Sequence, residues 1–115
     1  MPHPVIHVEI RTGDPDATRA FFADLFDWKY SDGEFPGYTF ADTGVPDAIP
    51  TAIGPLQGGD DNVLFFVGVQ DVGATLERAE ELGGSTVQAP VDVPGVTFGA
   101  FADPQGHVIG VAATS

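Results

Sequence analysis

The hydrophobic and polar positions of the chain follow first the period of a β-strand and then the period of a helix. Residues 5–12 carry Ile6, Val8 and Ile10 at alternate positions, which predicts a strand with one apolar face. Asp14 and Pro15 then suit a helix N-cap and the first helical position. An apolar stripe behind them predicts an amphipathic helix that covers the apolar face and ends near residue 27. The side chains of this stripe are Phe21, Phe22, Leu25 and Phe26.

The same order returns in the second half of the chain. Residues 63–69 are almost continuously apolar, which predicts a strand buried on both faces. Asp71 is placed to cap a second helix, and Gly83-Gly84 is placed to end it, because glycine adopts the left-handed conformation without a steric penalty. Further strands are expected at residues 28–31, 38–41 and about 51–53, and at about 86–91, 96–102 and 108–112.

Short motifs repeat between the two halves. The segments Asp-Pro-Asp-Ala-Thr (14–18) and Asp-Val-Gly-Ala-Thr (71–75) share three residues at an offset of 57. The tripeptide Phe-Ala-Asp recurs at 40–42 and 101–103, and the second copy leads into a tight turn, Asp-Pro-Gln-Gly at 103–106. A period near half the length of the chain predicts two copies of one supersecondary unit.

With these motifs, the whole chain resembles the glyoxalase, bleomycin-resistance and extradiol dioxygenase superfamily (vicinal oxygen chelate). The resemblance rests on a strand leading to an aspartate-capped helix in each half, on Gly83-Gly84 and on the Asp-Pro-Gln-Gly turn. It implies an α+β fold in which two tandem βαβββ modules form a U-shaped mixed sheet around a cleft. We expect one domain over residues 1–115, with module one at about 4–56, a polar, glycine-rich linker at about 57–62 and module two at about 63–113.

The charge and composition narrow the possible partners. Four basic residues against 17 acidic ones give a formal charge of −13, which disfavours nucleic acid and anionic membrane surfaces. The absence of cysteine removes disulfides and thiolate ligands. No apolar run is long enough to span a bilayer and the first ten residues do not resemble a signal peptide, so we predict a cytoplasmic protein.

By the same resemblance, metal ligands would come from inward positions on the first and last strands of each module. The residue seven before each helix cap is His7 in the first half but Leu64 in the second, and leucine has no lone pair to donate. The last-strand position that commonly carries glutamate in metal-binding relatives is Gly110. Residues 48–53 hold no Glu, Asp or His, and Asp47 in the loop before them is a weak substitute. Since a catalytic divalent ion normally needs three protein donors, we predict no metal and no cofactor.

Other interpretations of the polar residues on the first strand stay open. His7 and Glu9 lie about 6.6 Å apart along a strand and both could point inward, but a third donor would require His107, which its context places in a turn. His7 could equally be a histidine hydrogen-bonded to Glu9 or to a carbonyl. Glu9 and Arg11 could form a solvated strand face with a weak ion pair.

The sequence therefore predicts a metal-free protein that binds a small apolar or aromatic molecule in an aromatic-lined cleft. The candidate cleft residues are His7, Glu9, Trp28, Tyr38, Leu64, Phe66, Phe98 and Gly110. One alternative is a metal-dependent lyase, isomerase or dioxygenase of the same superfamily; another is a metal-free enzyme with His7 and Glu9 as general base and acid. The apolar surplus of the first helix and unpaired strand edges predict a homodimer.

Overall fold

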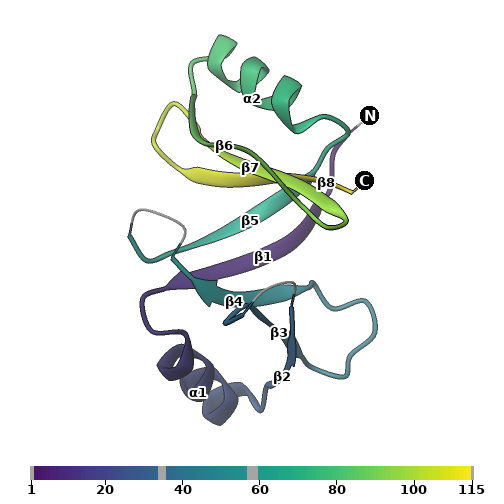
Figure 1. Ribbon diagram of the computed structural model, residues 1–115, viewed down its shortest axis with the longest axis vertical. Helices are drawn as coiled ribbons and strands as arrows, with labels where there is room; N and C mark the ends of the chain where they lie inside the picture. Colours follow the sequence, from purple (N-terminus) through teal and green to yellow (C-terminus); the bar gives the residue numbers. More distant parts are fainter. Residues whose placement is uncertain (1, 34–35, 57–59, 115) are drawn as a thin grey trace. The chain divides into compact units, whose positions relative to one another are not determined.

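A computed structural model describes residues 2–33, 36–56 and 60–114 of the chain. Module one contains β1 (Val5–Thr12), α1 (Pro15–Phe26), β2 (Lys29–Asp32), β3 (Thr39–Asp42) and β4 (Thr51–Pro55). Module two contains β5 (Asn62–Gly68), α2 (Val72–Glu81), β6 (Ser85–Val93), β7 (Val96–Ala102) and β8 (Val108–Thr114) (Figure 1). Both modules therefore have the order βαβββ.

The strands of the two modules pair in the same way. The strand order is β2-β3-β4-β1 in module one and β5-β8-β7-β6 in module two. The first strand pairs in parallel with the last, β1 with β4 and β5 with β8, and the remaining pairs are antiparallel. This shared pairing confirms the predicted α+β fold and the internal repeat.

The chain divides into two compact units, one of residues 7–63 and the other of residues 1–6 with 64–115. The first residues join the second unit through a hydrogen bond that the Gly68 amide donates to the Pro4 carbonyl, at 2.9 Å. Part of the expected linker, residues 57–59, lies outside the described residues, and the domain boundaries stay a prediction. Within the described residues, neither helix is long and apolar enough to cross a membrane.

The repeated Asp-x-x-Ala-Thr segment is the N-terminal cap of each helix. The Asp14 carboxylate accepts a hydrogen bond from the Ala17 amide at 3.0 Å, and the Asp71 carboxylate accepts one from the Ala74 amide at 2.9 Å. The threonine that follows each alanine donates its hydroxyl to the carbonyl of the same aspartate. These bonds satisfy amides that the first turn of a helix leaves unpaired, which explains why both helices begin where the sequence predicts.

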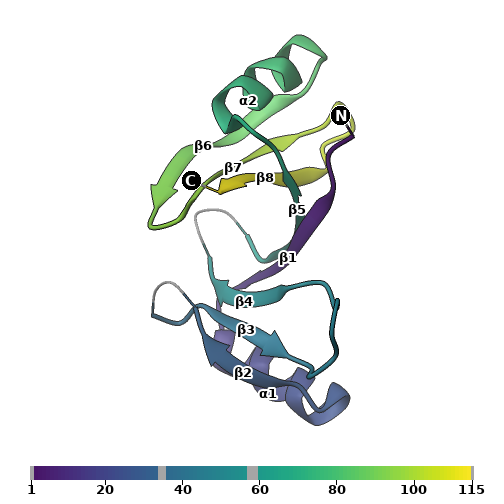
Figure 2. The ribbon, with the colours of Figure 1, turned by 90° about the vertical axis from the view of Figure 1, so that its right-hand side faces the viewer.

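The two helices differ in how much apolar surface they bury. Helix α2 covers one face of β6, β7 and β8, where Val72 and Leu76 pack against Val111 (Figure 2). Helix α1 has no buried residue, although the sequence predicts that it covers the apolar face of the first strand. The prediction that residues 63–69 are buried on both faces is wrong, because β5 buries only alternate side chains, those of Leu64 and Phe66.

Candidate functional site

The strand register defines equivalent positions in the two modules. His7 is the third residue of β1 and Leu64 is the third residue of β5, and each lies seven residues before its helix cap. Two residues further on, Glu9 is paired with Ala52 of β4, and Phe66 is paired with Gly110 of β8. Ala52 is therefore the counterpart of Gly110 in module one. Neither residue has a side-chain donor for a metal.

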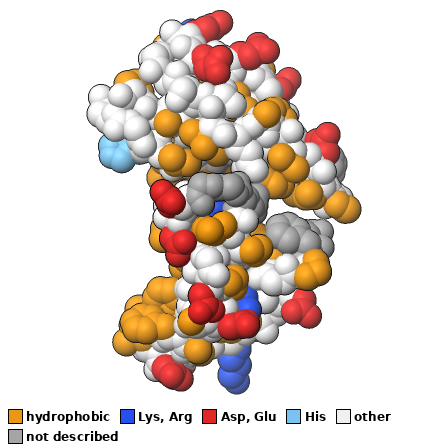
Figure 3. Space-filling model, turned by 60° about the vertical axis from the view of Figure 1, so that its left-hand side comes forward, with side chains coloured by type: hydrophobic (Ala, Val, Ile, Leu, Met, Phe, Trp, Pro, Cys, Tyr) orange, Lys and Arg blue, Asp and Glu red, His pale blue; other side chains and the backbone are white. Residues whose placement is uncertain are grey.

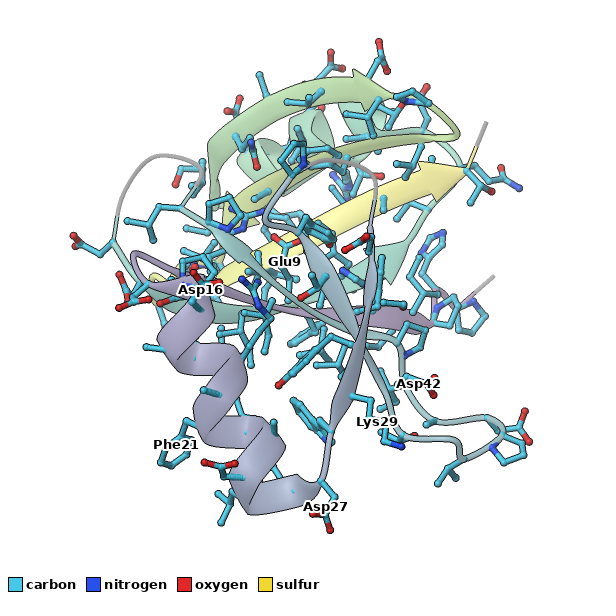
Figure 4. The ribbon with its side chains drawn as sticks, turned by 60° about the horizontal axis from the view of Figure 1, so that its bottom comes forward. Glu9, Asp16, Phe21, Asp27, Lys29 and Asp42 are labelled. Atoms are coloured by element: carbon cyan, nitrogen blue, oxygen red, sulfur yellow. The ribbon has the colours of Figure 1, made fainter. Side chains whose placement is uncertain are left out.

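In module one these positions form a buried polar cluster, which we call the Glu9 network and which consists of His7, Glu9, Arg11 and Tyr38. The Tyr38 hydroxyl donates to Glu9 Oε1 at 2.6 Å, and Arg11 Nε donates to Glu9 Oε2. His7 Nε2 lies 2.9 Å from the Tyr38 oxygen and 3.7 Å from Glu9 Oε1. Strand β1 supplies three of the four side chains from alternate positions (Figure 4 labels Glu9).

The directions of these hydrogen bonds fix the protonation of the network. A phenol has one hydrogen, and Tyr38 gives it to Glu9, so its oxygen can only accept from His7. His7 must therefore carry a proton on Nε2. Burial raises the pKa of Glu9, but hydrogen bonds from His7, Tyr38 and Arg11 and the charge of Arg11 outweigh it, so the pKa lies below its ordinary value. Glu9 is thus held as a carboxylate.

The interpretation of Glu9 and Arg11 as a solvated strand face is wrong. Their exposed fractions are only 4% and 6%, and the two side chains form a buried ion pair. The Tyr38 hydroxyl reaches Glu9 from a segment 29 residues away and forms a buried hydrogen bond with it. Arg11 is the network member that the candidate residues omitted. Arg11 could have been predicted as a member from its position two residues after Glu9, on the same face of the strand.

In module two the equivalent positions form an apolar cluster. Leu64 and Phe66 are buried with Ala112, and Phe98 packs against them, its ring centroid 6.5 Å from that of Phe66. A Cβ added to Gly110 would lie 2.5 Å from two carbon atoms of the Phe66 ring. Gly110 is therefore small because the Phe66 ring occupies the space over it.

The remaining candidate residues lie elsewhere in their own modules. Trp28 joins the aromatic side chains of α1, with its ring centroid 5.3 Å from that of Phe22. Asp47 is exposed and has a left-handed backbone, with φ of 66°. His107 pairs with Asp103 across the Asp-Pro-Gln-Gly turn at 2.9 Å, which agrees with its prediction as a turn residue. A hydrogen bond from the His107 backbone amide, together with one from the His107 side chain, holds the pKa of Asp103 below its usual value.

The donor set does not fit the divalent metal that the fold suggests. Of the four equivalent positions, only His7 carries a donor; Leu64, Ala52 and Gly110 carry none. The second donor on β1, Glu9, is already bound by Arg11 and Tyr38. A carboxylate at position 110 would have to displace the Phe66 ring. Across the described part of the chain, no group of three or more His, Cys, Asp or Glu side chains could hold a metal ion.

Module two also contains an apolar pocket of about 580 Å³ beside α2. Its lining includes Ala74, Ala79 and Leu82 of the helix region and Phe101 and Pro104 near the turn. None of the candidate cleft residues lines it. Its volume lies in the range of small-molecule sites, so an apolar compound could bind there, away from the candidate cleft residues.

The fold and register agree with a comparison of the sequence with protein families. The model of the glyoxalase/bleomycin resistance protein/dioxygenase superfamily matches residues 5–111, and the chain belongs to this superfamily. It is 27% identical over 107 residues to a Mycobacterium tuberculosis protein named "Putative glyoxylase CFP32" and to the protein of the same name from Mycobacterium bovis. The match covers 90% of this chain but 41% of those proteins, so the chain spans about two fifths of their length.

Solved structures show the same fold at low sequence identity. A superfamily member from Vibrio splendidus 12B01 is 17% identical with a TM-score of 0.63, covering 99% of this chain and 100% of that chain. The Mn(II)-bound glyoxalase from Novosphingobium aromaticivorans is 20% identical with a TM-score of 0.62, covering 95% of this chain and 37% of that chain. At these identities the likeness shows the fold, and the function has to be argued from the residues of this chain.

Proposed function

We propose that this protein binds a small apolar or aromatic molecule without the help of a metal ion. The observation that carries the proposal is the contact between Gly110 and the Phe66 ring. At the position where a metal-binding relative would place a carboxylate, this chain has Gly110, and the Phe66 ring occupies the space over it. The metal-binding positions of module two have become part of an apolar core.

Module one supplies the groups that would contact such a molecule. The His7 side chain retains 17% exposure, and its ring packs edge-on against Phe40, which also packs edge-on against Tyr38. Aromatic rings offer apolar contact area at little conformational cost, and the Glu9 network holds the His7 and Tyr38 rings in fixed positions. The proposed ligand contact is therefore the aromatic group of His7, Tyr38 and Phe40.

Two alternatives keep the same residues but assign other chemistry. A metal-dependent lyase, isomerase or dioxygenase would need donors that the described residues do not bring together. Acid–base catalysis without metal is favoured by one observation, the hydrogen-bond chain from His7 through Tyr38 to Glu9. The lowered pKa of Glu9 speaks against Glu9 as the acid, because a carboxylate that is held charged does not release a proton.

A thermal-shift screen of metabolites and antibiotics tests the proposal, because a compound that binds the native state raises the melting temperature. Compounds that stabilise the protein are then titrated against His7→Ala and against His107→Ala, a matched control at an exposed turn histidine. We expect His7→Ala to weaken binding and His107→Ala to leave it unchanged. Equal binding by both variants would overturn the proposed contact, and a stoichiometric divalent ion in protein purified without chelators would favour the metal-dependent alternative.

The remaining expectations about partners and location are also proposals. The charge of −13 supports a protein that avoids nucleic acid and anionic membranes. A cytoplasmic location stays a prediction from the sequence. Localisation of a fluorescently tagged copy in the source cell would check it.

A further inference from the structure

The apolar pocket of about 580 Å³ beside α2, which we call the α2 pocket, lies within one of the two compact units of the chain. All the residues that line it belong to residues 1–6 and 64–115. Two of them, Val69 and Phe101, pack against the buried core cluster that contains Leu76. The core of module two therefore supports the pocket, which is formed without any rearrangement, as most small-molecule sites are.

The helix side of the α2 pocket is built from small side chains. Ala74 and Ala79 of α2 line it together with Leu82, the last residue of the helix region. At a rise of 1.5 Å per residue, Ala74 and Leu82 lie about 12 Å apart along the helix axis. Pro104 closes on the end of the helix, since a Cβ added to Gly83 would lie 3.7 Å from Pro104 Cγ. The pocket is thus an elongated apolar space along α2.

The charged side chains of the α2 pocket favour a cation. Asp71 and Asp103 line the pocket, and so does Arg78. The charge of Arg78 is already paired with Glu81, with 3.0 Å between Arg78 Nη1 and Glu81 Oε1. The two aspartates therefore set the sign of the charge in the pocket.

Asp103 is held in its charged form and retains room for another hydrogen-bond donor. Its Oδ1 accepts from the amides of Gln105 and His107, at 3.0 and 2.9 Å, and its Oδ2 lies 2.9 Å from His107 Nδ1. The bonds from His107 are the main reason why the pKa of Asp103 lies below its usual value. Because a carboxylate has about four lone-pair sites, Asp103 can accept a further bond from a ligand.

The charge of the whole chain acts in the same direction. The formal charge is −13, and Figure 3 shows acidic side chains spread over the visible face, with basic ones at few places. A field of this sign raises the local concentration of cations and lowers that of anions. An organic anion with an apolar body is therefore a poor occupant of the pocket.

We propose that the α2 pocket binds a small organic amine, whose hydrocarbon body fills the apolar space and whose ammonium group pairs with Asp103. Hydrogen bonds from an ammonium to a carboxylate are roughly twice as strong as those between neutral groups. The site is separate from the proposed contact of His7, Tyr38 and Phe40 in module one. The inference therefore goes beyond the proposed function and does not depend on it.

The test is calorimetric titration at neutral pH with three probes that share one hydrocarbon chain: octylamine, octanol and octanoate. An alkylamine is protonated at this pH, as a lysine side chain is. We expect octylamine to bind most tightly, octanol less tightly and octanoate least. Added salt should weaken the binding of octylamine and leave that of octanol unchanged, because only the first includes an ion pair.

Filling the pocket locates the site. Ala74 is exposed and lines the pocket, so Ala74→Phe should fill the space without disturbing the core and weaken the binding of octylamine and octanol about tenfold or more. The matched control is Ala17→Phe. Ala17 is also exposed and occupies the same position after the cap of α1, so this variant should bind both probes as the unchanged protein does.

Removing one charge tests the ion pair. Asp103→Asn should weaken the binding of octylamine several-fold and leave that of octanol unchanged. The matched control is Asp42→Asn, because Asp42 is the counterpart of Asp103 in the repeated Phe-Ala-Asp motif, and its side chain also accepts from an amide two residues later (Figure 4 labels Asp42). Asp42→Asn removes the same charge outside the pocket and should bind octylamine normally.

Four results would overturn the proposal. One is octanol or octanoate that binds at least as tightly as octylamine. Another is an Ala74→Phe variant that binds octylamine as the unchanged protein does, and a third is the same result for Asp103→Asn. The fourth is loss of octylamine binding in His7→Ala, because the amine would then lie at the proposed contact in module one.

Discussion

Replacing Gly110 with alanine tests the packing that separates this chain from a metal-binding relative. The new Cβ would lie 2.5 Å from Phe66 Cδ2 and Cε2 and 2.8 Å from Phe66 Cγ. Cγ is held close to the backbone, and the ring is buried against Phe98, so it cannot turn away without disturbing the core. Overpacking of this kind costs about 1–3 kcal/mol of unfolding free energy.

The sign of the change in unfolding free energy caused by Gly110→Ala is informative as well as its size. At a site with space for the methyl group, a change from glycine to alanine stabilises a protein by about 0.4–1 kcal/mol, because it restricts the unfolded chain. Gly73→Ala in α2 is such a control, since its Cβ would lie 3.5 Å from its nearest neighbouring atom, a carboxylate oxygen of Asp71. We expect Gly110→Ala to lower the melting temperature by roughly 4–12 °C and Gly73→Ala to raise it slightly.

A double-mutant cycle with Phe66→Leu assigns the cost to the ring. If the contact is the cause, Gly110→Ala should cost much less in the Phe66→Leu background, with a coupling free energy of about 1 kcal/mol or more from urea denaturation. An unchanged cost in both backgrounds, or a stabilising Gly110→Ala, would show that the Phe66 ring does not limit the space at position 110.

Three further predictions concern the buried charge and the helix caps. Glu9→Gln should cost about 3–5 kcal/mol, measured by urea denaturation at neutral pH, because Arg11 loses the carboxylate it is paired with. Folding lowers the pKa of Glu9, so the ionised Glu9 carboxylate stabilises the protein above the ordinary value of 4.5, and this stabilisation is lost as the pH falls towards the folded value. The Glu9→Gln variant should lack this part of the loss of stability in acid. An identical dependence of stability on pH in the variant and the unchanged protein would contradict the prediction. Tyr38→Phe should cost about 1–3 kcal/mol, because Glu9 Oε1 loses a donor inside the protein, and a neutral effect on thermal unfolding would count against the network. Asp71→Ala should cost about 1 kcal/mol through the lost cap, and a change below about 0.3 kcal/mol would show that the cap is dispensable.

The parts of the fold that follow from local chemistry could be predicted from the sequence. Asp14 and Asp71 mark the helix starts because a side chain caps an amide three residues later, which the sequence contains by itself. The turn at 103–106 is equally local, and Gly106 has the positive φ, 93°, that its place requires. Strand β6 is longer than predicted, at Ser85–Val93, and its pairing with β7 contains register shifts that the local pattern does not indicate.

The candidate site depended on contacts that the local pattern does not contain. Alternation places Glu9 and Arg11 on the polar face of a strand, but the structure buries that face, and Tyr38 from a segment 29 residues away bonds to Glu9 there. The match of Phe66 to Gly110 requires the register of two parallel strands joined through α2, β6 and β7. Glycine at position 110 could be recognised as a missing donor, while the ring that fills its place could not.

Calorimetric titration of the chelator-treated protein with Zn²⁺, Ni²⁺, Mn²⁺ and Fe²⁺ shows whether the protein binds a divalent metal. We expect that none of these ions binds with micromolar or tighter affinity, because three of the four equivalent positions carry no donor and Glu9 is already bound. One tight site with a stoichiometry of one ion per chain, lost in the His7→Ala variant, would show instead that the protein binds a metal through His7, as a metal-dependent member of its superfamily would.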